Sequence, residues 1–278
     1  MIVCRSASEL RRLRDVNRLV GQVLEQLREA VAPGVTTHDL DAIAEREIRA
    51  GGAVPAFKGY KGYPATICAS VNEQVVHGIP SPKTALRDGD IVSIDLGAKM
   101  GGFFGDSAVT IGVGRISPQA AELLRVTEES LWKAIAAVRP GARVSDIGHA
   151  VQQYVEKFGF SVVREFVGHG IGVELHEEPQ IPNYGDPGRG PRLAEGMALA
   201  IEPMVNAGDA GVKVLRDGWT AITSDRSLSA HFEHTVAVTA DGAEVLSLSR
   251  SAAHAAEPGI RVSGLGMSQS PSPNPQSR

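Results

Sequence analysis

Apolar residues recur every three or four positions in two long stretches of the chain, and each is followed by a shorter stretch of the same kind. This spacing predicts amphipathic helices, at about 6–32 and 37–51 and again at about 117–139 and 145–159. Ser6 or Ser8 is the expected cap of the first helix, and Ser145 that of the fourth. Pro-Gly pairs after the first and third helices mark their ends.

Short β-branched and apolar runs, separated by glycines, follow each helical pair. They predict strands at about 66–76, 91–97 and 107–113, then at about 161–167, 197–205 and 234–238. Runs of strands that follow runs of helices favour an α+β fold with a mostly antiparallel sheet.

The two helix-strand runs are related by a shift of 107 positions. The shift carries Pro33-Gly34 onto Pro140-Gly141, Gly52 onto Gly159, and Asp95 onto Glu202. A repeat of this length indicates a duplicated half-domain rather than a solenoid. We expect halves at about 6–113 and 114–248 that face each other across a pseudo-twofold axis. Asp106 and Glu233 form a second candidate pair, displaced by an insertion of about 20 residues near 206–229.

Length and composition support one domain of moderate charge. With 278 residues, 42% of them hydrophobic, the chain can form one large core or two coupled halves. We expect a single catalytic domain over 1–248. The segment 249–278 is rich in Ser, Pro and Ala and is expected to be a disordered tail.

Charge and cysteine content limit the partners. The net charge of −4 and the absence of a basic run give no reason to expect nucleic acid. The two cysteines, Cys4 and Cys68, suggest neither a disulfide framework nor a zinc knuckle, so a reducing cytoplasm is expected. No segment approaches the roughly 20 apolar residues of a membrane span, and the amino terminus does not resemble a signal peptide.

Five residues are the candidates for chemistry: Asp95, Asp106, His169, Glu202 and Glu233. Each lies in or beside an apolar or Gly-rich run, where an unpaired charge is costly. Any single acid at a strand end is normally a turn residue or a salt-bridge partner. Together, four carboxylates and an imidazole suit divalent Mn, Fe(II), Co or Zn. Five ligands fit two ions better than one, and such a pair favours hydrolysis of an amide, ester or phosphate.

Other histidines lie at predicted loop rims. A lone loop histidine is normally only solvated, which is one interpretation of His77 and His176. However, His176 follows His169 by seven positions and could reach the same cleft as a hydrogen-bonding group that is not a ligand. Strand alternation should turn His234 away from the face of Glu233. His231 receives no role.

Five sequence blocks resemble the type I methionine aminopeptidases: NEQVVHGIP, DLGAKMGGFFGDSA, VGHGIGVELHEEPQIPNYG, LAIEPMV and DRSLSAHFEHTVAVT. They occur in family order over nearly the whole chain to about Leu248. The resemblance implies the pita-bread fold, two α-β halves about a pseudo-twofold axis. Phe57 and Lys61 differ from the residues that some relatives have at these positions. This difference concerns the rim of the expected substrate pocket and not the metal ligands.

The resemblance also implies residue roles. Asp95, Asp106 and Glu233 would bind one metal, and Asp106, His169, Glu202 and Glu233 the other. Glu202 would shuttle the proton, while His77 and His176 would act at the substrate peptide. The expected methionine pocket comprises Phe57, Tyr60, Tyr63, Cys68, Leu175 and Trp219.

The implied reaction is removal of the initiator methionine from nascent proteins whose second residue is small. It implies a monomeric, cytoplasmic enzyme that associates transiently with ribosomes. Two rivals stay open: a related pita-bread X-Pro peptidase, and a pita-bread binding protein without catalysis. Such binding proteins usually lose metal ligands, whereas all five positions are filled here.

Overall fold

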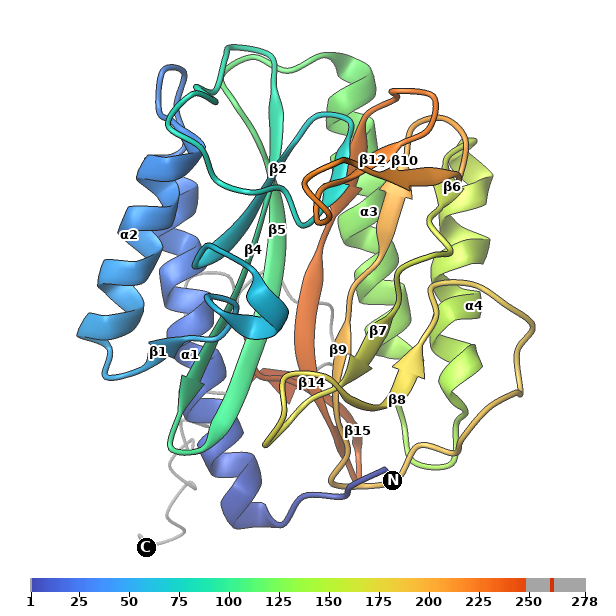
Figure 1. The fold of residues 1–278 in the computed structure, drawn as a ribbon. Coiled ribbons are helices and arrows are strands. Elements are labelled where there is room, and N and C mark those ends of the chain that lie inside the picture. Colours follow the sequence, from blue (N-terminus) through green and yellow to red (C-terminus); the bar gives the residue numbers. More distant parts are fainter. Residues whose placement is uncertain (1, 249–260, 263–278) are drawn as a thin grey trace, which may run out of the picture.

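The computed structural model describes residues 2–248 and 261–262; most of the predicted tail, 249–278, therefore lies outside the described residues. Four α-helices flank a central sheet of ten strands (Figure 1). They are α1 (Ala7–Ala30), α2 (Thr37–Ala50), α3 (Pro118–Ala136) and α4 (Val144–Val155), with short 3-10 helices at Tyr60–Gly62 and Glu156–Phe158. Within the described part of the chain, no helix is long and apolar enough to cross a membrane.

The central sheet has the order β1-β4-β5-β14-β9-β7-β8, with β2 paired to β4 and β15 to β14. Its neighbouring strands are antiparallel, except for the parallel pair β15–β16. Two three-stranded sheets, β13-β10-β6 and β11-β12-β3, lie beside it. The strands are β1 (Val54–Pro55), β2 (Ile67–Val71), β3 (Gln74–Val76), β4 (Ile91–Met100), β5 (Phe103–Gly112), β6 (Ser161–Val162), β7 (Gly168–Gly170), β8 (Glu177–Ile181), β9 (Ala198–Ile201), β10 (Met204–Asn206), β11 (Val212–Val214), β12 (Ala221–Thr223), β13 (Ser229–His231), β14 (Glu233–Thr239), β15 (Gly242–Val245) and β16 (Arg261–Val262).

The helical prediction holds, with one wrong cap. Ser6 caps α1 in a capping box with Glu9, as the sequence indicated. The fourth helix instead begins after Arg143, and Ser145 lies inside its first turn. The Ser145 hydroxyl accepts a hydrogen bond from the Arg189 backbone N–H at 2.7 Å, so it is used across a loop rather than as a cap.

Four predicted strands differ from the structure. The run 197–205 divides into β9 and β10, which lie in different sheets, and the run 161–167 shortens to β6. The run 66–76 divides into β2 and β3 at a turn where Asn72 has a φ of 55°. The strand expected from 107 begins at Phe103, so Asp106 lies within β5 rather than before it. Gly101 and Gly102, both with positive φ, join β4 to β5 as a two-residue hairpin. Two-residue hairpin connections favour turns in which both central residues have positive φ.

The backbone repeats at the same shift of 107 positions. The isolated bridge Thr36–Ala85 has its counterpart in Arg143–Arg192. The hydrogen bond from Gly34 N to Leu86 O, 2.8 Å, recurs from Gly141 N to Leu193 O, 2.9 Å. Each half thus ties the end of its first helix to the loop that leads into its central strand. The exact limits of the two halves stay a prediction.

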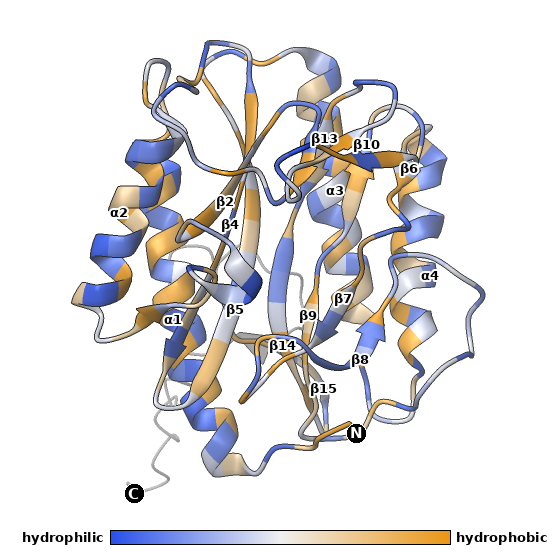
Figure 2. Cartoon of the chain, viewed as in Figure 1, coloured by the Kyte–Doolittle hydropathy of each residue, from blue (hydrophilic) through white to orange (hydrophobic). Residues whose placement is uncertain are grey.

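The helices cover one face of the central sheet. Helix α1 packs on β4 and β5, and α3 packs on β14 and β9 (Figure 1). Their apolar sides face the sheet while their polar sides face outward (Figure 2). Leu13, Val16 and Val20 of α1 are fully buried there. These helices do not cover the opposite face of the same strands.

One glycine in a helix shows that packing outweighs propensity. Gly148 in α4 is so close to the loop after β8 that a Cβ atom would lie 2.2 Å from Pro182 O. Gly148→Ala should gain about 1 kcal/mol of helix propensity. The overlap with backbone should cost more, so we expect net destabilisation of about 1–2 kcal/mol.

Urea unfolding followed by circular dichroism measures this effect as a lower midpoint. Gly211→Ala is the matched control, because its new Cβ would meet nothing closer than 3.4 Å. A midpoint for Gly148→Ala at or above that of the wild type would contradict the expectation.

Candidate metal centre

Five adjacent strands each supply one of the five predicted ligand residues. Asp95 lies in β4, Asp106 in β5, Glu233 at the start of β14, Glu202 directly after β9 and His169 in β7. These strands are neighbours in the order β4-β5-β14-β9-β7. The structure therefore brings the five residues into one row across the middle of the sheet.

Strand register places all five side chains on one face. Ala108 is paired with Asp95 on one side and with Glu233 on the other. Ala200 is paired in the same way with His169 and Thr235. Directly paired residues, and residues two apart on one strand, point to the same face. The small side chains of Ala108 and Ala200 leave room for the larger polar ones.

The polar atoms of the row are close together. His169 Nε2 lies 3.5 Å from Glu202 Oε1 and 3.9 Å from Asp106 Oδ2. Ligand atoms of Asp106, His169 and Glu233 all lie within 4.8 Å of one another, a geometry that could hold a metal ion. The other imidazole nitrogen, His169 Nδ1, is 2.9 Å from Gly170 O, which fixes the ring and leaves Nε2 facing the carboxylates.

Glycines allow the strands to close around His169. A Cβ atom on Gly168 would lie 2.4 Å from Ala200 O, and one on Gly170 would lie 2.3 Å from Glu178 O. Only glycine permits this approach of neighbouring backbones. The Gly-His-Gly pattern therefore positions the imidazole of a candidate ligand.

Burial makes the carboxylates costly to ionise. It raises the pKa of Asp95 and of Glu202 to about 7. It raises the pKa of Asp106 and of Glu233 well above the usual range, and neighbouring carboxylates add to both shifts. Desolvation and like-charge repulsion thus act together against the charged forms.

The donor set fits divalent cations. Three buried carboxylate oxygens, Asp95 Oδ1, Asp106 Oδ1 and Glu233 Oε1, have no hydrogen-bond partner among the described residues. Buried carboxylates without such partners are usually paired with cations. Oxygen ligands with one imidazole suit several first-row divalent metals.

A cavity of about 180 Å³ opens over this row. It is lined by the thirteen side chains that the sequence singled out, together with Lys61: Phe57, Tyr60, Lys61, Tyr63, Cys68, His77, Asp95, Asp106, His169, Leu175, His176, Glu202, Trp219 and Glu233. No residue of α1 to α4 is among them. The site occupies the face of the sheet that the helices leave free.

Aromatic and apolar groups form one wall of the cavity. The Tyr63 and Trp219 rings meet edge to face with centroids 5.1 Å apart. The Tyr63 hydroxyl donates to the carbonyls of Ile67 and Gly78, so the ring presents its apolar part. Burial raises the pKa of the Cys68 thiol, which keeps it neutral and unreactive.

Two further imidazoles face the cavity as neutral groups. Partial desolvation lowers the pKa of His77 to about 4, and partial desolvation together with the nearby His169 and Lys61 lowers that of His176 to about 3. The Tyr60 hydroxyl lies 3.0 Å from His176 Nδ1, and the two rings stack. If that hydroxyl donates, Nε2 of His176 carries the proton and can donate to a ligand.

Comparison with known proteins identifies the family. Residues 11–240 match the family model of Metallopeptidase family M24. The chain belongs to this metallopeptidase family. It is 55% identical over 246 residues to methionine aminopeptidase 1 of Bacillus subtilis, covering 88% of this chain and 99% of the relative. It is 48% identical over 252 residues to methionine aminopeptidase 1 of Mycobacterium tuberculosis, covering 88% and 94%.

Solved structures of M24 enzymes share the architecture. A methionine aminopeptidase from Thermotoga maritima superposes with a TM-score of 0.88 at 48% identity, covering 89% of this chain and all of that one. A prolidase from Pyrococcus horikoshii gives a TM-score of 0.74 at 23% identity, covering 90% and 65%. The second likeness concerns the fold alone. Together they confirm the pita-bread α+β class.

The sequence analysis missed one residue of the candidate metal centre. His231, at the end of β13, is buried, and its Nε2 lies 3.6 Å from Glu202 Oε2. Its ring nitrogen has no hydrogen-bond partner among the described residues. Glu202 is therefore placed between two imidazoles, His169 at one oxygen and His231 at the other. Strand alternation could have indicated this position. His231 precedes Glu233 by two positions and so shares its face, whereas His234 follows by one position and points to the other face.

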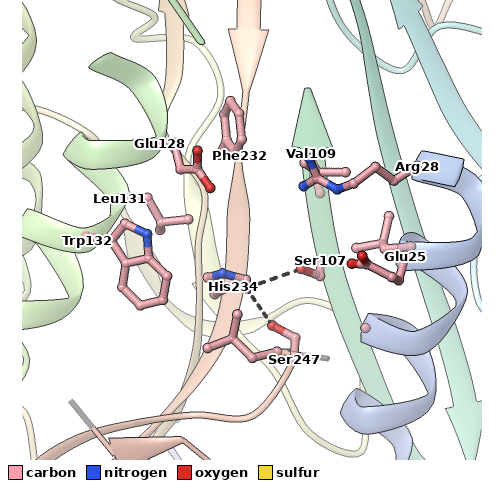
Figure 3. A pocket seen from close by; sticks show the side chains of 14 residues that line it. Glu25, Arg28, Ser107, Val109, Glu128, Leu131, Trp132, Phe232, His234 and Ser247 are labelled. Atoms are coloured by element: carbon pink, nitrogen blue, oxygen red, sulfur yellow. Dashed lines mark hydrogen bonds between the residues drawn. The ribbon is translucent and has the colours of Figure 1, made fainter. Parts of the chain in front are cut away.

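The reverse face of the same strands lines a separate cavity (Figure 3). There His234 Nδ1 lies 2.9 Å from Ser247 Oγ and 3.5 Å from Ser107 Oγ. Ser107 and His234 directly follow Asp106 and Glu233 in their strands. As expected from alternation, His234 points away from the metal centre.

Metal binding to this site should be linked to proton release. Because burial raises the pKa of Asp95 and Glu202 to about 7, a cation must displace protons from the site near neutral pH. We expect Mn²⁺ to bind chelator-treated protein more tightly at pH 8 than at pH 6. Calorimetric titration in two buffers of different ionisation enthalpy measures both affinity and released protons. Equal affinity at both pH values would contradict this expectation.

Thermal unfolding provides the matching stability test. A carboxyl whose folded pKa is raised destabilises the fold as pH rises toward and through that pKa, and a bound cation offsets this loss. Metal at one hundred times its Kd should stabilise the protein by about 2.7 kcal/mol. The gain in midpoint at a fixed metal concentration should therefore be larger at pH 8 than at pH 6.

Proposed function

We propose that the protein removes the initiator methionine from nascent polypeptides whose second residue is small. The observation that carries the proposal is an apolar, aromatic cavity directly over a complete row of five metal-ligand candidates. Relatives of about 50% identity over most of the chain carry the name methionine aminopeptidase, which supports this activity over the two rivals.

Asp95, Asp106 and Glu233 would hold one divalent cation, and Asp106, His169, Glu202 and Glu233 a second one. When bound, such ions acidify a water molecule and polarise the scissile carbonyl. The donor set accepts Co, Mn, Fe(II) or Zn. The unpartnered oxygens of Asp95, Asp106 and Glu233 support this arrangement.

Glu202 would accept the proton of the attacking water and deliver it to the leaving amine. A pKa of about 7, caused by burial, suits a group that must both take and give a proton near neutral pH. His169 and His231 lie within 3.6 Å of its two oxygens and would limit its rotation.

His176 and His77 would contact the substrate peptide. His176, held through Nδ1 by Tyr60, would donate from Nε2 to the carbonyl oxygen as negative charge develops there. His77 has a left-handed backbone with φ of 60° at the end of β3, a strained conformation of the kind found at functional sites.

The pocket for methionine would be formed by Phe57, Tyr60, Tyr63, Cys68, Leu175 and Trp219. Aromatic edges and a buried thiol suit a thioether side chain. Lys61, with its Nζ 5.3 Å from the centre of the Tyr60 ring, adds a positive charge at the rim.

The cellular setting follows from the substrate. Nascent amino termini arise at ribosomes, so the enzyme would act in the cytoplasm through transient contact with them. We propose that it does so as a monomer.

Peptide hydrolysis separates the three candidate functions. With added Mn²⁺ or Co²⁺, the protein should release methionine from Met-Ala-Ser and leave Leu-Ala-Ser and Met-Pro-Ser nearly intact. Preferential cleavage before proline would indicate an X-Pro peptidase. Release of no amino acid under any metal would leave the binding-protein alternative.

A second test concerns Glu202 alone. Glu202→Gln should lower kcat for Met-Ala-Ser by about 10²–10⁴-fold, because the amide cannot accept the proton. Glu202→Ala should abolish turnover. Metal content and unfolding midpoint, measured on the same samples, separate lost chemistry from lost structure. Near-normal kcat in a folded, metal-loaded variant would refute the assigned role.

A further inference from the structure

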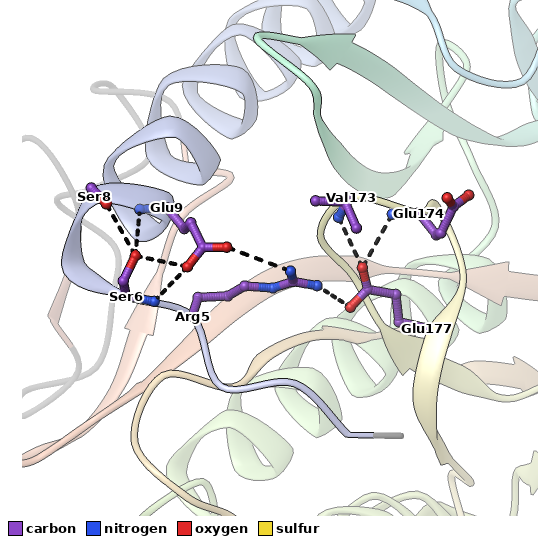
Figure 4. A network of polar contacts seen from close by, with 7 residues as sticks. All are labelled: Arg5, Ser6, Ser8, Glu9, Val173, Glu174 and Glu177. Carbon is purple, nitrogen blue, oxygen red and sulfur yellow. Dashed lines mark hydrogen bonds and ion pairs between the residues drawn. The ribbon is translucent and has the colours of Figure 1, made fainter.

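The amino-terminal arm, residues 2–6, lies beside the loop 171–176 that leads into β8 (Figure 4). Arg5 is the centre of this contact. Its side chain is only 4% exposed, and its backbone N–H donates to Gly196 O at 2.7 Å. A buried guanidinium at the edge of a domain needs a structural or functional reason.

Two glycines make the space for Arg5. A Cβ atom on Gly172 would lie 2.2 Å from Arg5 Nη2, and one on Gly196 would lie 2.7 Å from Arg5 O. Gly196 also has a φ of 89°, which favours glycine. The arm thus fits a slot that only small residues allow.

Glu177 joins Arg5 to the loop. Its Oε2 accepts a hydrogen bond from Arg5 Nη2, with a side chain that is 12% exposed. Its Oε1 accepts from the backbone N–H groups of Val173, at 2.8 Å, and Glu174, at 3.1 Å. One carboxylate therefore fixes both the arm and the loop backbone (Figure 4).

The loop held in this way carries two side chains of the proposed substrate site. Leu175 is 1% exposed and lines the cavity. The His176 ring lies tilted against that of His169, with centroids 4.3 Å apart. Both residues lie between Glu174 and Glu177, so the carboxylate of Glu177 closes the segment that presents them.

We infer that the Arg5–Glu177 ion pair is a positioning clamp for His176 and Leu175. This inference rests on the proposed function. Burial of an ion pair is a poor source of stability, since an apolar pair of similar size does as well. The pair instead fixes the orientation of the Glu177 carboxylate. The planar guanidinium holds one carboxylate oxygen, and the second oxygen accepts hydrogen bonds from the loop amides.

Hydrogen exchange tests the clamp without any assay of activity. In Arg5→Met, the amides of 171–178 should exchange at least about tenfold faster, because the Glu177 carboxylate is no longer oriented. Rates elsewhere should change little. Arg14→Met is the matched control. Arg14 lies in α1 and pairs with buried Glu244 through hydrogen bonds of 2.7 and 2.6 Å, away from this loop.

Kinetics tests the consequence for the site. Arg5→Met should lower kcat/KM for Met-Ala-Ser by about 10–100-fold, with kcat reduced through His176 and KM raised through Leu175. Arg5→Lys should restore part of both, since it keeps the charge but not the fork. Arg14→Met should leave both parameters near those of the wild type at temperatures below its unfolding transition.

Wild-type exchange rates in 171–178 of Arg5→Met would overturn the clamp, as would acceleration of equal size throughout the chain, which indicates global destabilisation. Faster loop exchange with unchanged kcat and KM would overturn the positioning role. If the wild type cleaves no methionyl peptide, the proposed function fails, and the exchange measurement still decides whether the clamp exists.

Discussion

Four carboxylates in one row across the sheet, two of them buried and two half-buried, set the main constraint on this structure. Each one is expensive to ionise alone, and together they repel, which is why burial and neighbours raise all four pKa values. A protein keeps such a row only if something compensates the charge. The alanines among these side chains, the glycines around His169 and the absence of helix residues from the cavity lining all leave room for cations there.

The repeat explains how the row is assembled, and the insertion explains why it is not symmetric. Equivalent hydrogen bonds in the two halves, such as those of Gly34 and Gly141, deliver β4 and β9 to matching places. Asp95 and Glu202 are thereby related. In the second part of the chain β9 is followed by β10 to β13, and this segment supplies His231 beside Glu202 and Trp219 in the cavity wall. The same scaffold can thus hold two acids in different surroundings and give them different chemistry.

Much of this was readable from the sequence because it depends on local pattern. Apolar spacing and caps gave the helices, and acids beside apolar runs gave the row. Family resemblance, rather than any pattern, gave the pocket. The hairpin at Gly101-Gly102 was missed, although its two glycines are a local signal, and Asp106 was therefore placed before its strand. Alternation with Glu233 indicated the face of His231, but not its partner Glu202, which is 29 positions away. The ion pair of Arg5 could not be predicted, because its partner is 172 positions away and only tertiary packing selects it.

The contacts of the amino-terminal arm bear on the order in which the site becomes complete. Arg5 N donates to Gly196 O, and Gly196 N donates to Val238 O, so the arm docks on a surface made by the second half and the final long strand. The loop with His176 is held by Glu177, whose orientation depends on that docked arm. Contacts of such sequence separation form late, because the chain must close long loops before they contribute. The metal row needs such contacts too, because β5 pairs with β14 through Ser107 and His234, which are 127 positions apart. The substrate face needs in addition that the arm, residues 2–6, has docked beside Gly196 and Glu177.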